Sequence, residues 1–280
     1  MSPLQGFIEA REIWQVPLAA SVVAGALLGA LGVYVVLRRT VFVSAALTQL
    51  STLGMVVALL VEERIHIETE HPSEQLAVAV AFSIAGALIL GAWRSRRLPA
   101  EASVGAGWVV ASALVVLGTS RLVHAAHDLS GMVFGNAVAV SATELGVLAA
   151  VFVVALVVHV LFEKELVFSS FDPETARALG VRVGLWDTVL FASVGVAIPP
   201  AARALGALPV FALLTLPAAG ALLAGTRLRA AFVIAGVTGV LAAGGGYLFS
   251  WFAETPTGAT MVVAAAAFVL PAVALRALRR

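Results

Sequence analysis

Four of the five histidines lie in two short polar segments, where they could bind a metal ion. His124 and His127 are three residues apart with Asp128 beside them, and His66 and His71 border a second segment that also holds carboxylates. Imidazole and carboxylate groups suit Zn²⁺ and Mn²⁺, and three of them can form an open site. The pattern predicts metal contact, with ordinary interfacial polar residues that face water as the alternative.

Two further ionisable residues stand alone in apolar surroundings. His159 falls late in an apolar run, so it is a functional candidate or a hydrogen-bond donor to a neighbouring helix. Glu254 comes at the end of another run, just before Pro256 and Gly258. We expect Glu254 to line an entrance from outside, with an exposed loop carboxylate as the alternative. The chain has no cysteine, which excludes thiolate ligands.

The composition is that of a polytopic membrane protein. Hydrophobic residues make up 61% of the chain, charged residues only 12%, and the mean hydropathy is +1.04, far from the values of soluble domains. The formal net charge is +1, and no basic patch points to nucleic acid as a partner. The expected surroundings are membrane lipid.

The apolar runs predict an all-α bundle of about eight or nine membrane-spanning helices, since each crossing needs roughly 20 apolar residues. We expect spans near 14–37, 41–61, 75–93, 103–122, 142–162, 184–202, 206–225, 229–252 and 258–276. Arginines gather in alternate loops, which the positive-inside rule assigns to the cytoplasm. The short segment 1–13 is then outside and the C-terminus inside, within one domain over residues 1–280.

The pair of runs between 184 and 225 differs from the others in its prolines. Pro199, Pro200, Pro209 and Pro217 interrupt them, which favours broken or re-entrant helices and an outer link at 201–205. Small residues are frequent elsewhere, as in 25–32 and 244–246, and let helices approach closely in lipid. They indicate a tight bundle, which we expect to be dimeric.

A polar segment at 163–183 falls on the arginine-rich side and predicts a short helix outside the bilayer. Asp172 can cap this helix, Pro173 fits its first turn, Glu174 suits its positive end, and Gly180 can stop it. Such a helix is suited to receive force from a soluble motor subunit. The residues expected to take part are Phe171, Asp172, Pro173, Glu174, Ala176, Arg177, Ala178, Leu179 and Gly180.

Four segments, in order along the chain, resemble the permease subunits of bacterial ABC transporters for zinc and manganese, the ABC-3 metal permeases. The segment 171–181 is similar to the family's coupling segment, and Met132–Asn136 with Val140–Leu145 resembles its Leu-Phe-Gly region. Leu205–Ala219 resembles its Gly-Ala-Leu…Leu-Pro-Ala-Ala helix, and Glu254–Gly258 its Asp-x-Pro-x-Gly turn. The resemblance implies a homodimer in the bacterial cytoplasmic membrane, fed by an extracytoplasmic metal-binding protein and driven by two cytoplasmic ATP-binding cassette subunits.

One feature of the chain agrees with this implication. A phosphate-binding P-loop needs Gly-x-x-x-x-Gly-Lys-Ser/Thr, and the only lysine is Lys164, between two glutamates. The chain therefore lacks an ATPase motif of that type, and a partner subunit must use the ATP. No cofactor is expected on this chain beyond the transported Zn²⁺ or Mn²⁺.

The chain departs from the family where metal permeases carry Asp and His four residues apart, within Gly-Asp-x-Leu-x-His-x-x-x-x-Gly. The corresponding stretch is Ser44-Ala-Ala-Leu-Thr-Gln-Leu-Ser-Thr-Leu-Gly54, which places Ala45 and Gln49 at the two ligand positions. Gln49 is a poor zinc ligand but can line a polar path. Three hypotheses therefore stay open: a permease for zinc or manganese ions, a permease for a metal chelate or other small solute, and a non-transporting scaffold.

Overall fold

The structure is a computed structural model that describes residues 9–65, 72–92, 100–122, 140–225 and 227–278. Within these ranges it is helical, without strands. The long helices are α2 (Arg11–Leu37), α3 (Val41–Ile65), α4 (Pro72–Ala92), α5 (Ala100–Thr119), α7 (Ala142–Leu161), α10 (Val183–Leu205), α11 (Ala207–Leu223), α12 (Leu228–Ala253) and α13 (Thr257–Leu278). Two short helices, α8 (Glu163–Phe171) and α9 (Pro173–Ala178), join α7 to α10.

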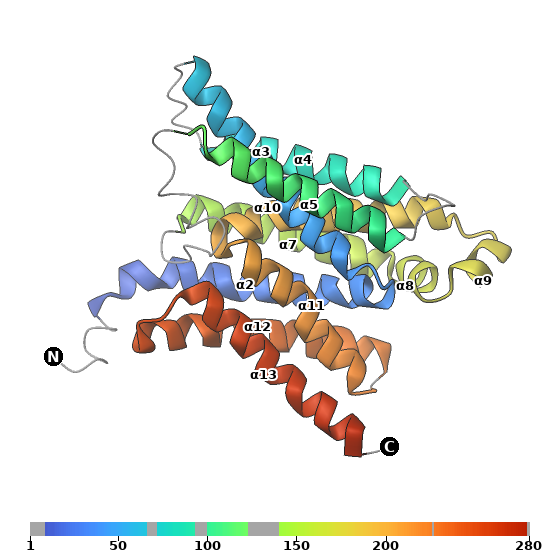
Figure 1. Cartoon of the computed structure of the whole chain (residues 1–280). Coiled ribbons are helices and arrows are strands. Elements are labelled where there is room, and N and C mark those ends of the chain that lie inside the picture. The colour runs from blue at the N-terminus through green and yellow to red at the C-terminus, as the bar shows by residue number, and fades with distance from the viewer. Residues whose placement is uncertain (1–8, 66–71, 93–99, 123–139, 226, 279–280) are drawn as a thin grey trace.

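The long helices run side by side, with α3, α4 and α5 along one edge of the bundle and α12 and α13 along the other (Figure 1). Helix α2 lies in the interior, where it packs against α12, α11 and α7. Leu27, Leu28 and Tyr34 of α2 are buried in the main core, together with Leu213 and Leu214 of α11. An apolar helix buried by other helices explains why α2 carries small and hydrophobic residues around most of its circumference.

Glycines allow α2 and α12 to touch backbone to backbone. A side-chain methyl at Gly25 would clash with the carbonyl oxygen of Gly239, and one at Gly29 would clash with that of Ala235. Close approach at small residues is the usual way in which membrane helices associate. The small residues predicted to make a tight bundle therefore act here between helices of one chain, and the dimer stays a prediction.

Helices α10 and α11 are continuous, which corrects the expectation of broken helices and of an outer link at 201–205. Helix α10 runs through Pro199 and Pro200 to Leu205, and α11 contains Pro209 and Pro217. Only Gly206 separates them, with a φ of 94° that a residue with a side chain rarely adopts. Prolines are tolerated inside these helices because neighbouring helices cover the freed backbone groups.

All nine predicted runs are helical in the part of the chain that the structure describes. Seven helices there are long and apolar enough to cross a membrane, and two shorter apolar segments, 74–89 and 207–223, accompany them. The all-α membrane fold is thus confirmed, and the count of eight or nine crossings stays a prediction. The start of α2 and the end of α13 lie at opposite ends of the bundle (Figure 1), as an odd number of crossings requires.

Candidate coupling site and ion path

Helix α9 is capped as the sequence predicts. Asp172 Oδ1 accepts a hydrogen bond from the backbone N–H of Thr175 at 3.1 Å, and Pro173 occupies the first turn. At the other end, Gly180 has a φ of 82°, and the N–H of Val181 donates to the carbonyl of Ala176 at 2.9 Å. This combination of N-cap, first-turn proline and C-terminal glycine stabilises a helix of only six residues.

The cap also shifts the titration of Asp172. Hydrogen bonds from the side chain and the backbone of Thr175 stabilise the carboxylate, and they hold its pKa below the ordinary value. The group is therefore ionised at neutral pH. Its negative charge lies at the N-terminal end of α9, where the helix dipole favours it.

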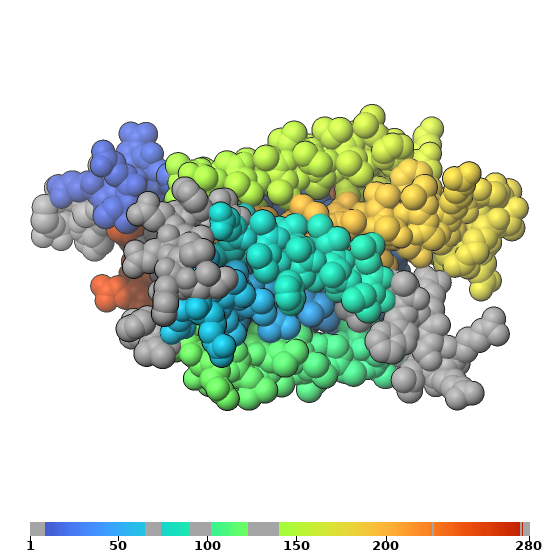
Figure 2. Space-filling model, turned by 90° about the horizontal axis from the view of Figure 1, so that it is seen from above, coloured from blue at the N-terminus to red at the C-terminus, as the bar shows by residue number. Residues whose placement is uncertain are grey.

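Helix α9 lies at the end of the bundle, in the yellow part of the chain at the right of Figure 2, and exposed apolar residues flank it. Ala176 is fully buried and anchors the helix, whereas Phe171 and Leu179 are 74% and 70% exposed. Glu174, Arg177 and Ala178 are also exposed. An exposed apolar patch with a charged rim, on a segment outside the spans, is typical of a protein–protein contact.

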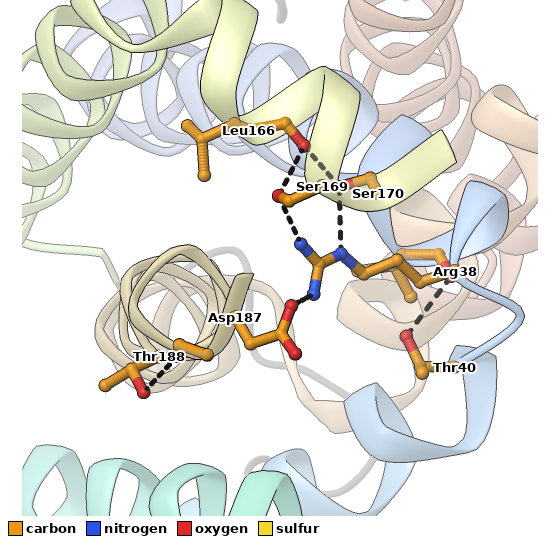
Figure 3. Close-up of polar contacts among 9 residues, drawn as sticks. Arg38, Thr40, Leu166, Ser169, Ser170, Asp187 and Thr188 are labelled. Carbon is orange, nitrogen blue, oxygen red and sulfur yellow. Dashed lines mark hydrogen bonds and ion pairs between the residues drawn. The ribbon is translucent and has the colours of Figure 1, made fainter. Parts of the chain in front are cut away.

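A guanidinium group ties the flanks of α9 to the central helix. Arg38, directly after α2, donates from Nε to Ser170 Oγ at 2.8 Å and from Nη2 to Ser169 Oγ at 3.1 Å. Its Nη1 forms an ion pair with Asp187 Oδ1. Figure 3 shows these side chains converging from α2, α8 and α10. We call this set of four residues the Arg38 network.

The Arg38 network is shielded from solvent, which makes it stronger than a surface ion pair. The side chains of Arg38 and Asp187 are 8% and 14% exposed, and hydrogen bonds between charged groups in such surroundings are weakly screened. Arg38 belongs to the arginine-rich loops that the sequence predicts to be cytoplasmic, but the sequence does not predict the network. Its partners lie 131 to 149 residues further along the chain, and no local pattern indicates them.

A second ion pair holds the other end of α10. Arg203 Nε donates to Glu144 Oε1 at 2.5 Å, and Glu144 also closes a capping box with Ser141 at the start of α7. Helix α10 is therefore fixed to the end of α2 near its own start, and to α7 at its opposite end. A helix held in this way can transmit movement between the two membrane faces.

The two positions that align with the Asp and His ligands of metal permeases lie on α3, next to a series of hydroxyl groups. Gln49 and Ala45 are half-buried, and Ser44, Thr48, Ser51 and Thr52 are buried on the same helix. Thr48 and Thr52 donate to backbone carbonyls one turn earlier, at 2.7 and 3.0 Å. The helix thus offers an amide and hydroxyl oxygens, without a carboxylate or an imidazole in that stretch.

Five of the predicted metal-path residues lie outside the described residues, so the structure does not place them: His66, His71, His124, His127 and Asp128. Among the residues it does place, no group of three or more histidine and carboxylate side chains could hold a metal ion. The outer histidine segments therefore stay predictions.

His159 is buried on α7. Its Nδ1 lies 2.7 Å from the carbonyl oxygen of Ala155 on the same helix, and its ring packs 5.2 Å from that of Tyr34. Of the two alternatives for His159, Nδ1 does not form the hydrogen bond to a neighbouring helix, because the preceding turn already supplies an acceptor. A functional role for His159 stays a prediction. Nε2 has no hydrogen-bond partner within the described ranges.

Glu254 is exposed in the turn between α12 and α13. Its backbone is left-handed, with a φ of 51°, and ends α12. Two hydrogen bonds fix the helices around the turn, from Ser250 to Thr257 Oγ1 at 3.1 Å and from Thr260 to the carbonyl of Gly246 at 2.9 Å. The carboxylate is therefore held at one end of the bundle and is accessible from solvent.

Comparison with known proteins agrees with this arrangement. The ABC 3 transport family matches residues 10–276. The chain is 27% identical to the manganese transport system membrane protein MntC of Halalkalibacterium halodurans, over 90% of this chain and 83% of that protein. It is 28% identical to MntC of Listeria monocytogenes, over 94% and 90%.

A solved structure shares the fold. PsaBC from Streptococcus pneumoniae, solved in complex with Fab, superimposes with a TM-score of 0.82 at 22% identity, over 96% of this chain and 95% of that one. The family match covers almost the whole chain, and the long apolar helices fit a multi-pass protein of the bacterial cytoplasmic membrane. The chain belongs to the ABC 3 transport family.

Proposed function

We propose that the chain is the permease subunit of an importer for a divalent transition metal ion, with manganese as the cargo and ATP hydrolysed by separate cassette subunits. The relatives described above are named for manganese transport. Oxygen donors such as those on α3 suit Mn²⁺ better than Zn²⁺, which favours nitrogen and sulfur ligands. Two copies of the permease would enclose the path, and an extracytoplasmic metal-binding protein would supply the ion.

The observation that carries this proposal is the geometry of α9. A capped helix lies outside the bundle, is flanked by the exposed side chains of Phe171 and Leu179, and is anchored through Ala176. Its neighbours α8 and α10 are both bound to Arg38 at the end of α2. When ATP draws the cassette subunits together, force on α9 would reach α2 and α10 through the Arg38 network and change access to the path.

The residues proposed for the ion path lie at two levels. Glu254 and the outer histidine segments would attract and receive the cation at the outer face, because carboxylate and imidazole groups bind it well. Gln49 would line the path within the membrane, and His159 is a further candidate on α7. The coupling role of the segment 163–183 is independent of these path roles, so an experiment that contradicts one does not contradict the other.

A second candidate cargo is a metal chelate or another small solute. It is favoured by Ala45 and Gln49, which replace the paired ligands of the resemblance, and by the lack of a histidine–carboxylate cluster among the placed residues. A chelated ion brings its own ligands and does not need a charged protein site. A scaffold without transport is the remaining alternative, and it would neither bind nor stimulate a cassette ATPase.

The test uses vesicles that contain the chain with its cassette ATPase and its binding protein. We expect ATP-dependent uptake of ⁵⁴Mn, with ⁶⁵Zn carried less well. Ala178→Arg places a long cation on the exposed face of α9 and should abolish uptake, whereas Ala178→Ser should retain it. Normal uptake by the arginine variant would contradict the coupling role. Hydrolysis of ATP without uptake of either ion would point to the chelate.

The outer residues are tested in the same vesicles. Glu254→Gln removes the charge and keeps the side-chain shape, and the double variant His124→Ala/His127→Ala removes both imidazoles. We expect each to raise the manganese concentration needed for half-maximal uptake and to leave basal ATP hydrolysis unchanged. Unchanged uptake by both variants would remove these residues from the proposed path.

A further inference from the structure

An open groove of about 410 Å³ lies beside α2, and His159, the path candidate on α7, is one of the residues that line it. Buried residues of α2, Leu27, Leu31 and Tyr34, form its floor, and residues of α7 and α12 such as Phe152 and Phe232 form its walls. The volume falls within the range of ligand-binding clefts. Helix α7 exposes most of its surface within the span, so the groove opens towards lipid.

One end of the groove carries an ion pair. Arg229 Nε donates to Glu163 Oε1 at 2.8 Å, and Nη2 lies 3.4 Å from Oε2. The Arg229 side chain is 81% exposed and that of Glu163 is 35% exposed, so both groups can accept further partners. Glu163 begins α8, next to the coupling helix, and Arg229 is in the first turn of α12, so this end faces the cytoplasm.

Apart from His159 and Tyr34, the rest of the groove is apolar, and it covers about half of the membrane. From Phe152 to its end at Leu161, α7 rises about 14 Å at 1.5 Å per residue, and Glu163 follows at the start of α8. The hydrocarbon core is about 30 Å thick, so the groove runs from the cytoplasmic interface to near the midplane. This length matches an acyl chain of one leaflet, whereas a transmembrane helix of another subunit would continue across the membrane.

We propose that the groove binds an inner-leaflet phospholipid whose headgroup carries a phosphate and a primary ammonium, as in phosphatidylethanolamine. The acyl chain lies along Leu27, Leu31 and Phe152, the phosphate contacts Arg229, and the ammonium donates to Glu163. Complementary charges argue for this headgroup. An anionic glycerol headgroup offers no cation for Glu163, and a choline headgroup has no N–H to donate.

Lipid retention by the purified chain tests the proposal. Native mass spectrometry in mild detergent would compare bound ethanolamine, glycerol and choline phospholipids after equal delipidation. We expect the ethanolamine lipid to be retained best. Arg229→Ala should weaken retention of each lipid roughly fivefold, as for one basic residue at a membrane surface, and Glu163→Gln should remove the preference over the glycerol lipid.

A steric variant supplies the matched control. Ala30→Phe fills the groove and should abolish tight retention, whereas Ala150→Phe, on the exposed surface of α7 outside the groove, should leave it unchanged. Equal retention of the three lipids, or no effect of Arg229→Ala and Ala30→Phe, would overturn the proposal. A cross-link between two copies through Leu156→Cys in the membrane would also overturn the proposal, because a second copy would then cover the groove in place of lipid. These readouts do not involve transport, so their failure leaves the proposed function untouched.

Discussion

Arg38 makes directed contacts with two different elements, so one side chain holds α8 and α10 to the end of α2. Arg38→Ala would leave the part-buried Asp187 carboxylate without this partner. We expect a loss of about 1–3 kcal/mol in the free energy of unfolding, since a poorly solvated polar group that loses its partner costs about that much. Thermal unfolding in detergent would measure this loss. Arg39→Ala, at the exposed neighbouring position, should change stability by less than about 0.5 kcal/mol.

A double variant separates stability from coupling at the same site. Arg38→Met with Asp187→Leu replaces the pair by apolar groups of similar size, which is often neutral for stability. We expect this variant to unfold near the wild-type temperature and still to show impaired ATP-driven uptake, because the contacts from α2 to α8 and α10 are lost. Wild-type uptake by the stable double variant would exclude the Arg38 network from force transmission.

Asp172 tests the cap of α9 through its charge. Its folded pKa is lowered, so the cap contributes stability above the ordinary pKa of about 3.9 and loses it as the pH falls through the lower folded value. Uptake should therefore not depend on this group between about pH 5 and pH 8. Asp172→Asn should retain coupling, since asparagine also caps well, and Asp172→Ala should reduce it. Equal coupling in the two variants would show that the Asp172 cap does not contribute to ATP-driven uptake.

At the scale of elements, the close contact between α2 and α12 depends on glycines, which have no side chain to separate the two backbones. Gly239→Ala would place a methyl against the carbonyl oxygen of Gly25, whereas the nearest atom to a methyl at Gly236 is 3.9 Å away. We expect Gly239→Ala to destabilise the bundle by about 1–3 kcal/mol, as overpacking does, and Gly236→Ala to be tolerated. Thermal unfolding of the two variants compares them. Equal stability would show that the helices can separate at low cost.

The sequence predicts elements well where local chemistry decides them. The cap residues of α9 follow local rules, and the predicted apolar runs coincide with the helices of the described chain. The link at 201–205 was predicted wrongly because the prolines were expected to end a helix, whereas neighbouring helices sustain α10 to Leu205. The partners of Arg38 and the pair Arg203–Glu144 depend on tertiary packing, so no sequence spacing indicates them.

At the scale of the whole molecule, the number of crossings decides on which side each end of the chain lies. The chain has no cysteine, so single cysteines can report the topology. With nine crossings, Glu12→Cys and Thr255→Cys should react with a membrane-impermeant maleimide in intact cells, and Arg177→Cys and Arg276→Cys only after permeabilisation. Labelling of positions 12 and 276 from the same side would instead indicate an even number of crossings.

The exposed apolar residues that flank α9 also bear on how much of the chain accumulates in a cell. If the cassette subunit binds here as proposed, a copy made without it leaves Phe171 and Leu179 exposed, and chaperones and proteases act on exposed hydrophobic surface of this kind. We therefore expect the steady-state amount of the chain to follow the supply of its cassette subunit. The same helix that receives force would then act as a check on subunit stoichiometry.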